Sequence, residues 1–134
     1  MGLAATDPAP EITAGEISAL VDTFYERVRL DSLIGPIFNR QVKDWPAHLA
    51  LLKDFWTTVI LGTGSFKGNP METHLKLLLE PGHFERWLEL FAATSREVLP
   101  APHAALFIGK SQRIADTFQR VIASHRSGLG VVPA

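Results

Sequence analysis

Four side chains of this sequence could together form a site that binds a small molecule at a metal ion. His48 and His74 lie on two separate apolar segments, with Tyr25 upstream of them and Trp87 downstream. An imidazole on one wall of a buried pocket could bind the metal, and a phenol and an indole on the other wall could donate hydrogen bonds. The rest of the sequence is then expected to be the scaffold that brings these side chains together.

His74 is the side chain best suited to bind a haem iron. Such an iron needs an axial nitrogen that is neutral, fixed in orientation and shielded from water. His74 lies in the opening turns of an expected short helix, and the leucine-rich run Leu75–Leu79 that follows could form a hydrophobic wall. From spacing alone, the alternative that His74 is a polar residue on the exposed side of its helix stays open.

His48 shares an expected helical face with three apolar residues, Leu52, Phe55 and Trp56. If that face covers the other side of a haem, His48 could donate a hydrogen bond to the ligand, swing outward as a gate, or bind the iron itself. The sequence also allows a surface histidine at the start of a helix.

Tyr25 and Trp87 are the expected hydrogen-bond donors. Tyr25 follows Phe24 on an otherwise apolar face, so its phenol is expected to point inward and to need a partner. The indole N–H of Trp87 can donate but never accept. Dioxygen on ferrous iron acquires partial negative charge, and two such donors, each worth ~1–1.5 kcal/mol, imply roughly hundredfold slower ligand loss. Taken singly, each aromatic could also be a core residue at helical spacing.

The composition fits one globular domain and excludes several other classes of protein. Of 134 residues, 46% are apolar, and 13 basic residues nearly balance 14 acidic ones, which gives no charge pattern for nucleic acid or an anionic membrane. The absence of cysteine excludes disulfides, iron–sulfur clusters and a thiolate haem ligand. The first residues lack the features of a secretory signal, and no apolar run approaches the ~20 residues of a membrane span. We therefore expect a cytoplasmic protein, with one domain over residues 13–127 and flexible tails over 1–12 and 128–134.

Apolar periodicity and capping signals predict an all-α fold with no convincing strand. Thr13 and Glu16 have the spacing of a capping box at the start of a first helix. Asp44 is the expected N-cap of the helix that carries His48, and Pro46 is tolerated in its first turn.

Three further helices are expected in the second half of the chain. The segment Asn69–Glu72 has the cap, proline and acid of a start signal, and it opens the short helix that carries His74. A longer helix that carries Trp87 must end near Val98, because the prolines at 100 and 102 cannot continue it. A last helix is expected over residues 103–125.

Other motifs carry little chemistry. The glycines of the segment 62–68 lack the Gly-Lys-Ser/Thr ending of a phosphate-binding loop and indicate a turn. None of the five histidines lies in a His-Glu-x-x-His motif or in a zinc-ligand cluster. The remaining polar residues of these segments are expected at the surface or at helix ends: His83, His103, His125, Glu85, Arg86 and Glu89.

The combined pattern over residues 15–125 resembles the group III branch of the bacterial truncated haemoglobins. Each piece alone has low specificity, whereas the series as a whole is specific. The pieces are Phe24-Tyr25-Glu-Arg-Val-Arg, Leu-Ile-Gly35-Pro36-Ile37-Phe38, Trp45-Pro-Ala-His48, Phe55-Trp56, Gly62-x-Gly64-x-Phe66-x-Gly68-x-Pro70, His74-Leu75 and Phe84-x-x-Trp87-Leu88-x-Leu-Phe91.

This resemblance implies a two-over-two helical sandwich around haem b. In it, His74 matches the proximal iron ligand, while Tyr25, Trp87 and His48 match the distal residues around the bound gas. One departure is Phe66, where relatives often have a tyrosine, and the motifs do not identify the residues that hold the haem propionates. The side chains expected to contact the haem, with Phe38 stacked on the porphyrin, are Phe38, Leu52, Trp56, His74, Phe84 and Trp87.

The implied function is binding of O2, and of NO and CO, at ferrous haem iron. Donors that hold the ligand favour redox turnover, such as oxidation of NO to nitrate or a peroxidase-like reduction, over transport. The expected protein is a monomer that an electron-donating reductase would serve, with no nucleic-acid or membrane partner. Two alternatives stay open: His48 binds the iron and makes a six-coordinate sensor or electron-transfer protein, or the chain is a haem-free helical module that binds a partner protein.

Overall fold

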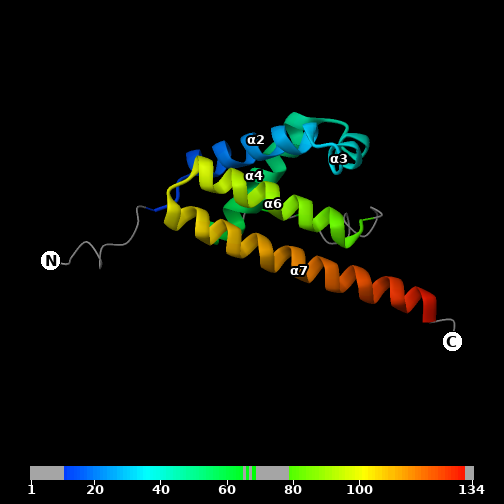
Figure 1. The fold of residues 1–134 in the computed structure, drawn as a ribbon. Helices are drawn as coiled ribbons and strands as arrows, with labels where there is room; N and C mark the ends of the chain where they lie inside the picture. The colour runs from blue at the N-terminus through cyan, green and yellow to red at the C-terminus, as the bar shows by residue number, and fades with distance from the viewer. Residues whose placement is uncertain (1–10, 65, 67, 69–78, 132–134) are drawn as a thin grey trace.

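The computed structural model describes residues 11–64, 66, 68 and 79–131, with side chains through His125, and within these ranges the chain is helical without any strand. The all-α fold predicted from the sequence is confirmed (Figure 1). The helices of the described chain are α2 (Ala14–Leu30), α3 (Gly35–Gln41), α4 (Trp45–Leu61), α6 (Pro81–Val98) and α7 (Ala101–Val131).

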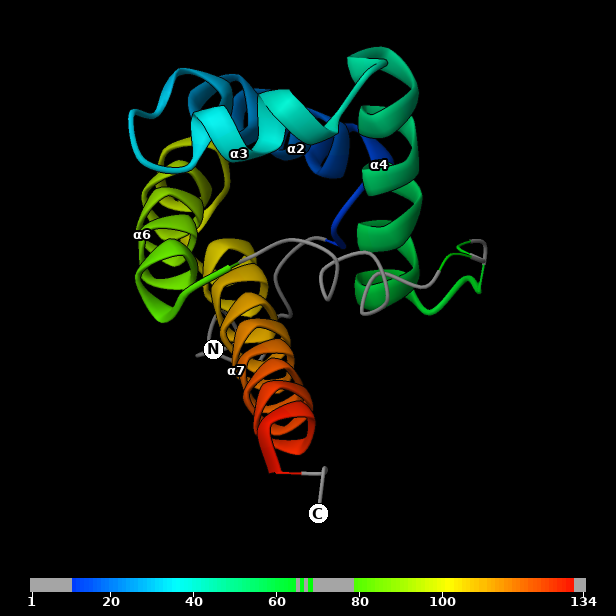
Figure 2. The same cartoon turned by 90° about the vertical axis from the view of Figure 1, so that its right-hand side faces the viewer.

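The long helices form two packed pairs, α2 with α4 and α6 with α7, and α2 also packs on α6. In Figure 2, α4 lies on one side of the molecule and α6 with α7 on the other, while α2 and the short α3 lie across the top. The arrangement confirms the two-over-two sandwich of helices that the resemblance implied. None of the described helices is both long and apolar enough to cross a bilayer.

The first helices begin where the capping signals predict. Thr13 and Glu16 exchange two hydrogen bonds of 3.1 Å between side chain and backbone, which closes the capping box of α2. The Asp44 carboxylate accepts a hydrogen bond of 3.1 Å from the Ala47 backbone N–H at the start of α4. α4 ends at Gly62, whose φ of 69° lies in the left-handed region that glycine adopts without strain.

Aromatic side chains from all four long helices meet in the core. Phe24 of α2, Trp56 of α4, Phe91 of α6 and Phe107 of α7 are all buried. Trp56 stacks on Phe91 with a ring-centroid distance of 5.1 Å and an interplanar angle of 17°, and its centroid lies 5.6 Å from that of Phe107. Aromatic pairs of this kind add about 0.5–1.5 kcal/mol beyond the area they bury, so this cluster fixes how the two layers meet.

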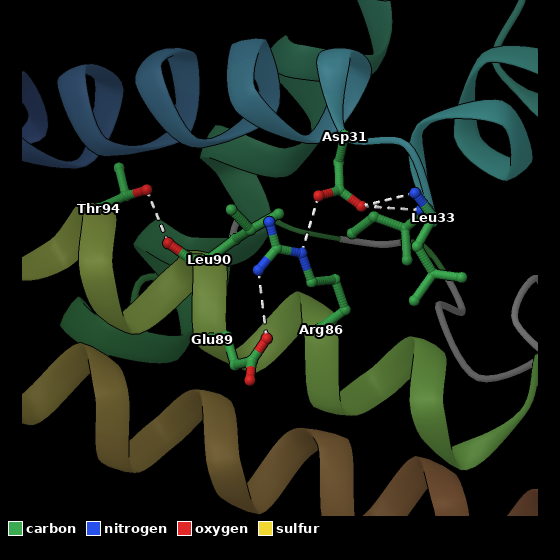
Figure 3. Close-up of polar contacts among 7 residues, drawn as sticks. Asp31, Leu33, Arg86, Glu89, Leu90 and Thr94 are labelled. Carbon is green, nitrogen blue, oxygen red and sulfur yellow. Dashed lines mark hydrogen bonds and ion pairs between the residues drawn. The ribbon is translucent and has the colours of Figure 1, made fainter.

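Asp31 joins the end of α2 to the middle of α6 (Figure 3). One carboxylate oxygen accepts hydrogen bonds of 3.0 Å from the backbone N–H groups of Leu33 and Ile34, and the other accepts 2.8 Å from Nε of Arg86. Burial alone would raise the pKa of Asp31, but these hydrogen bonds outweigh it and hold the pKa below its ordinary value. Arg86 lies on a partly solvated face, with 40% of its side chain exposed, and it also pairs with a residue 55 positions away, which the sequence did not indicate.

A second ion pair reinforces the same interface one turn earlier in α2. The Arg27 guanidinium donates to both carboxylate oxygens of Glu97, at 2.7 and 2.9 Å, and also to the Thr94 hydroxyl at 3.2 Å. A two-pronged contact of this geometry orients the two helices as well as holding them. The register of α2 on α6 is thus fixed at two points.

His103 lies at a helix end, in the first turn of α7, as the sequence indicates, but it is buried and does not lie at the surface. It is only 4% exposed, and its Nδ1 lies 2.9 Å from Oε2 of Glu16, the residue that also closes the capping box of α2. The helix that carries it is longer at both ends than expected. α7 begins at Ala101, with Pro102 in its first turn. A proline is tolerated there because the backbone N–H groups of a first turn have no acceptor within the helix. The helix extends beyond the other helices as far as Val131 (Figure 1).

Candidate functional site

A pocket of about 220 Å³ lies between α4 and the α6–α7 pair, with α2 and α3 at one side of it. Every predicted site residue within the described part of the chain lines this pocket. His74, the predicted iron ligand, and the short helix expected from Asn69 lie outside the described residues. The predicted residues that line the pocket are Tyr25, Phe38, His48, Leu52, Trp56, Phe84 and Trp87.

Tyr25 brings a deeply buried polar group to this lining. The residue is 4% exposed, and its ring packs edge-on against Phe24, with a centroid distance of 4.7 Å, and Phe38, at 6.2 Å. Burial raises the pKa of the Tyr25 phenol well above its ordinary value, and a hydrogen bond with Trp87 offsets this only in part. The phenol is therefore neutral at physiological pH and keeps a hydrogen that it can donate into the pocket.

Trp87 is held so that its indole N–H serves Tyr25. The indole stacks on Phe91, one helical turn further along α6, at 5.0 Å and 5°, and Phe24 lies edge-on to it at 5.2 Å. An indole nitrogen can only donate, so in its hydrogen bond with Tyr25 the phenol oxygen is the acceptor. A contact of this kind would leave the phenol as the donor to a ligand in the pocket, so the two residues would act in series, whereas the sequence-based estimate assumed two independent donors.

His48 lies in the first turn of α4 and faces Tyr25. Its ring centroid is 6.3 Å from that of Tyr25, at an interplanar angle of 90°, and 5.6 Å from that of Trp45, at 84°. The guanidinium of Arg29 lies 4.7 Å from the centroid of the Trp45 ring and covers it. These contacts place the His48 imidazole at the pocket and not on an unrelated surface of α4.

The lining divides into two sides that belong to different buried clusters. The Tyr25 side, made of Tyr25, Phe38, His48 and Trp87, packs with the main core around Phe24. The Phe84 side is formed by the second cluster, around Leu79, Phe84 and Ala115, together with the ring of Phe118. An apolar slot with two such walls suits a flat molecule with apolar faces.

His83 is a polar residue of the pocket to which the sequence assigned no role there. It is the third residue of α6, and its Nδ1 accepts a hydrogen bond of 2.9 Å from the backbone N–H of Glu80. Glutamate and glutamine are the usual residues at this capping position. A histidine three residues after Glu80 was therefore the feature of the sequence that could have indicated a capping role for His83. The α7 residues Ile114 and Phe118 also line the pocket and were not assigned to it.

The residues present fit a haem. Aromatic and aliphatic side chains from α3, α4, α6 and α7 form the walls, as the apolar faces of a porphyrin require. The neutral, buried phenol of Tyr25 lies at the wall of this pocket, where it could donate to a molecule bound there. In the described part of the chain, no group of three His, Asp or Glu side chains gathers as a metal site built from protein ligands alone would need.

Comparison with known proteins gives one relative by sequence and one by structure. The chain is 34% identical to the group 3 truncated haemoglobin ctb of Campylobacter jejuni over an alignment of 116 residues, and the match covers 83% of this chain and 91% of that protein. It also matches the crystal structure of the group III truncated haemoglobin from Campylobacter jejuni, with a TM-score of 0.79 and 33% identity over 87% of this chain and 95% of that one. No protein-family model matches the chain. The extent of the sequence match shows that this chain belongs to the group 3 truncated haemoglobins, a family of haem-binding globins.

Proposed function

We propose that this chain holds haem b in the pocket between α4 and the α6–α7 pair and binds O2, and also NO and CO, there. The observation that carries the proposal is the neutral, buried Tyr25 phenol, held by Trp87 at the wall of an apolar slot. When bound, haem supplies a redox-active iron at which a diatomic molecule is held. His74 is the proposed axial ligand on the basis of its match to the family motif.

Tyr25 is the residue that stabilises the bound diatomic molecule in this proposal. Its O–H would donate to a bound diatomic molecule, and a hydrogen bond from Trp87 would make the phenol a stronger donor by polarising it. A bond of this kind is worth about 1–1.5 kcal/mol, which corresponds to roughly tenfold slower loss of the ligand. Trp87 acts through Tyr25 and sets the direction in which the phenol points.

His48 is proposed as the second polar residue on the distal side, because its ring lies against Tyr25 at the wall of the pocket. An imidazole in that place can donate to the same ligand or control access to it. The alternative that His48 binds the iron would make a six-coordinate sensor or electron-transfer protein. A ferric absorption spectrum with a bis-histidyl, low-spin signature, lost in His48→Leu, would favour that alternative.

We propose redox turnover as the activity, in preference to O2 transport. A pocket that retains O2 through Tyr25 releases it too slowly for a carrier and leaves time for a second reactant to arrive. Reaction of NO and O2 to nitrate consumes one electron, which a reductase would supply, and a peroxidase-like reduction is the other candidate. In this proposal the protein is a cytoplasmic monomer.

The decisive experiment for haem binding is titration of the purified apoprotein with haemin. Wild-type protein is expected to develop a Soret band at one equivalent and to become red on reduction. His74→Ala is expected to lose the ferrous five-coordinate histidine signature while circular dichroism shows an unchanged helix content. A wild-type protein that is folded and helical but takes up no haem would support a helical interaction module in place of the proposed function.

A further inference from the structure

One polar side chain of the pocket, His83, has no part in the proposed chemistry on the Tyr25 side. It lines the same pocket from the first turn of α6, next to Phe84 and near Leu79. His83 is half-buried, and the residues of the buried cluster beside it are apolar. A donor in apolar surroundings needs an acceptor when a ligand displaces water from it.

The capping bond to Glu80 determines which ring nitrogen of His83 carries the hydrogen. The Glu80 backbone N–H lies 2.9 Å from Nδ1, and this hydrogen bond requires a lone pair on that nitrogen. A neutral imidazole with a bare Nδ1 carries its hydrogen on Nε2. His83 therefore offers an N–H donor on its Nε2 side, and it offers no lone pair to a metal while the cap is intact.

With its hydrogen on Nε2 and its Nδ1 lone pair used by Glu80, His83 can donate a hydrogen bond to an anion but cannot ligate an iron. A porphyrin with propionate groups has apolar faces and a carboxylate-bearing edge, and the edge must end where the slot becomes polar and reaches water. His83 is half-buried in the first turn of α6, and the start of that helix lies toward the same end of the molecule as α3 (Figure 1). The positive end of the α6 dipole favours an anion at this same turn.

We propose that His83 binds a haem propionate through its Nε2–H, with Glu80 as the positioning partner that fixes the tautomer. The proposal rests on the proposed haem binding and adds a residue for the carboxylate edge of the cofactor. His48, by contrast, is held against Tyr25 and Trp45 on the other side of the pocket. The two histidines that line the described part of the pocket would thus serve different parts of the ligand: His48 the iron-bound molecule and His83 the rim of the porphyrin.

The test is the rate at which haem leaves the protein, measured by transfer to excess apomyoglobin. His83→Glu keeps a good capping acceptor at this position but replaces the donor with a negative charge that repels a propionate. It is expected to lose haem about tenfold faster than wild type, whereas His83→Gln, which keeps both an acceptor and a donor, stays within about threefold. Reconstitution with haem dimethyl ester, which has no free propionate, is expected to abolish the difference between His83→Glu and wild type.

Each other outcome overturns the proposal in a recognisable way. Wild-type rates in His83→Glu would show that His83 does not contact the cofactor. Equal acceleration with haem and with its dimethyl ester would show that the residue only supports the helix start, and thermal unfolding of the apoproteins would then show the same loss. A wild-type protein that takes up neither haem nor the ester would reject the haem-binding proposal itself.

Discussion

The two sides of the pocket differ in how many protein contacts hold their polar groups. On the Tyr25 side, one phenol touches Phe24, Phe38, His48 and Trp87, and most of these residues are braced in turn by core aromatics. On the Phe84 side, His83 is set by one backbone hydrogen bond among the described residues. The core therefore braces the polar groups of the Tyr25 side more fully than the described contacts brace His83.

The largest expected effect comes from truncating the ring that supports both donors. Phe24→Ala removes a fully buried ring that contacts Tyr25, Trp87 and Phe91, and it is expected to lower the free energy of unfolding by about 3–5 kcal/mol. The matched variant Phe84→Ala lies in the smaller cluster and is 8% exposed, so a loss of about 2 kcal/mol is expected. Urea unfolding of the purified proteins measures both losses. Equal losses would break the comparison between the two sides.

Asp31 tests how much the ion pair with Arg86 stabilises the packing of α2 on α6. Asp31→Asn keeps an acceptor for the backbone N–H groups but removes the charge that pairs with Arg86, and a loss of about 1–2 kcal/mol is expected at pH 7. Because its folded pKa lies below the unfolded value of ~3.9, the charge stabilises the fold above that pH and loses its effect as the pH falls through the folded pKa.

Urea unfolding of Asp31→Asn and wild type from pH 7 to pH 3 is the measurement. The difference between the two proteins is expected to be largest near pH 7 and to shrink below about pH 4. The control is Asp116→Asn, which breaks the exposed pair with Arg120 on α7 and is expected to cost less than about 0.5 kcal/mol. A pH-independent difference at Asp31 would assign its role to the hydrogen bonds alone.

The smallest expected effects decide whether Tyr25 and Trp87 act in series. Tyr25→Phe is expected to speed O2 dissociation about tenfold, because it removes the donor to the ligand and keeps the ring. Trp87→Phe keeps an aromatic ring on Phe91 and is expected to speed it about threefold, since the phenol loses only its polarising partner. Stopped-flow displacement of O2 by CO measures both rates.

The double variant separates the two arrangements. Donors in series predict that Trp87→Phe has no further effect once Tyr25 is phenylalanine. Donors that contact the ligand independently predict the same factor in both backgrounds. An unchanged rate in Tyr25→Phe alone would remove Tyr25 from the proposed function.

Local signals predicted the helix starts, and distant pairs escaped prediction. Thr13 and Asp44 are N-caps whose hydrogen-bond partners lie three residues further along the chain, so the sequence shows both partners together. Arg86 pairs with Asp31, 55 positions away, and His103 with Glu16, 87 positions away. The residues next to them in the sequence do not indicate either partner. Arg86 was expected on a solvated face and His103 at the surface or at a helix end, because charged and imidazole side chains usually lie in such places.

The candidate site was predictable as a set of residues but not as a hydrogen-bond network. Helical periodicity and the family motif placed Tyr25, His48 and Trp87 together, and they do line one pocket. That the Trp87 N–H serves Tyr25 depends on the stacking of its ring on Phe91, which fixes a direction that spacing does not encode. The role of His74 as the iron ligand stays a prediction.

The carboxylate of Glu16 links events that should occur at different times in folding. Its Oε1 accepts from Thr13 three residues away, a contact that an isolated helical turn can form early. Its Oε2 meets His103 only after a loop of 87 residues has closed, at an entropic cost of about 4 kcal/mol. The same side chain thus caps α2 and later joins it to α7. A chain shortened past Glu16 would therefore lose both the capping box that starts α2 and the contact that holds α2 to α7.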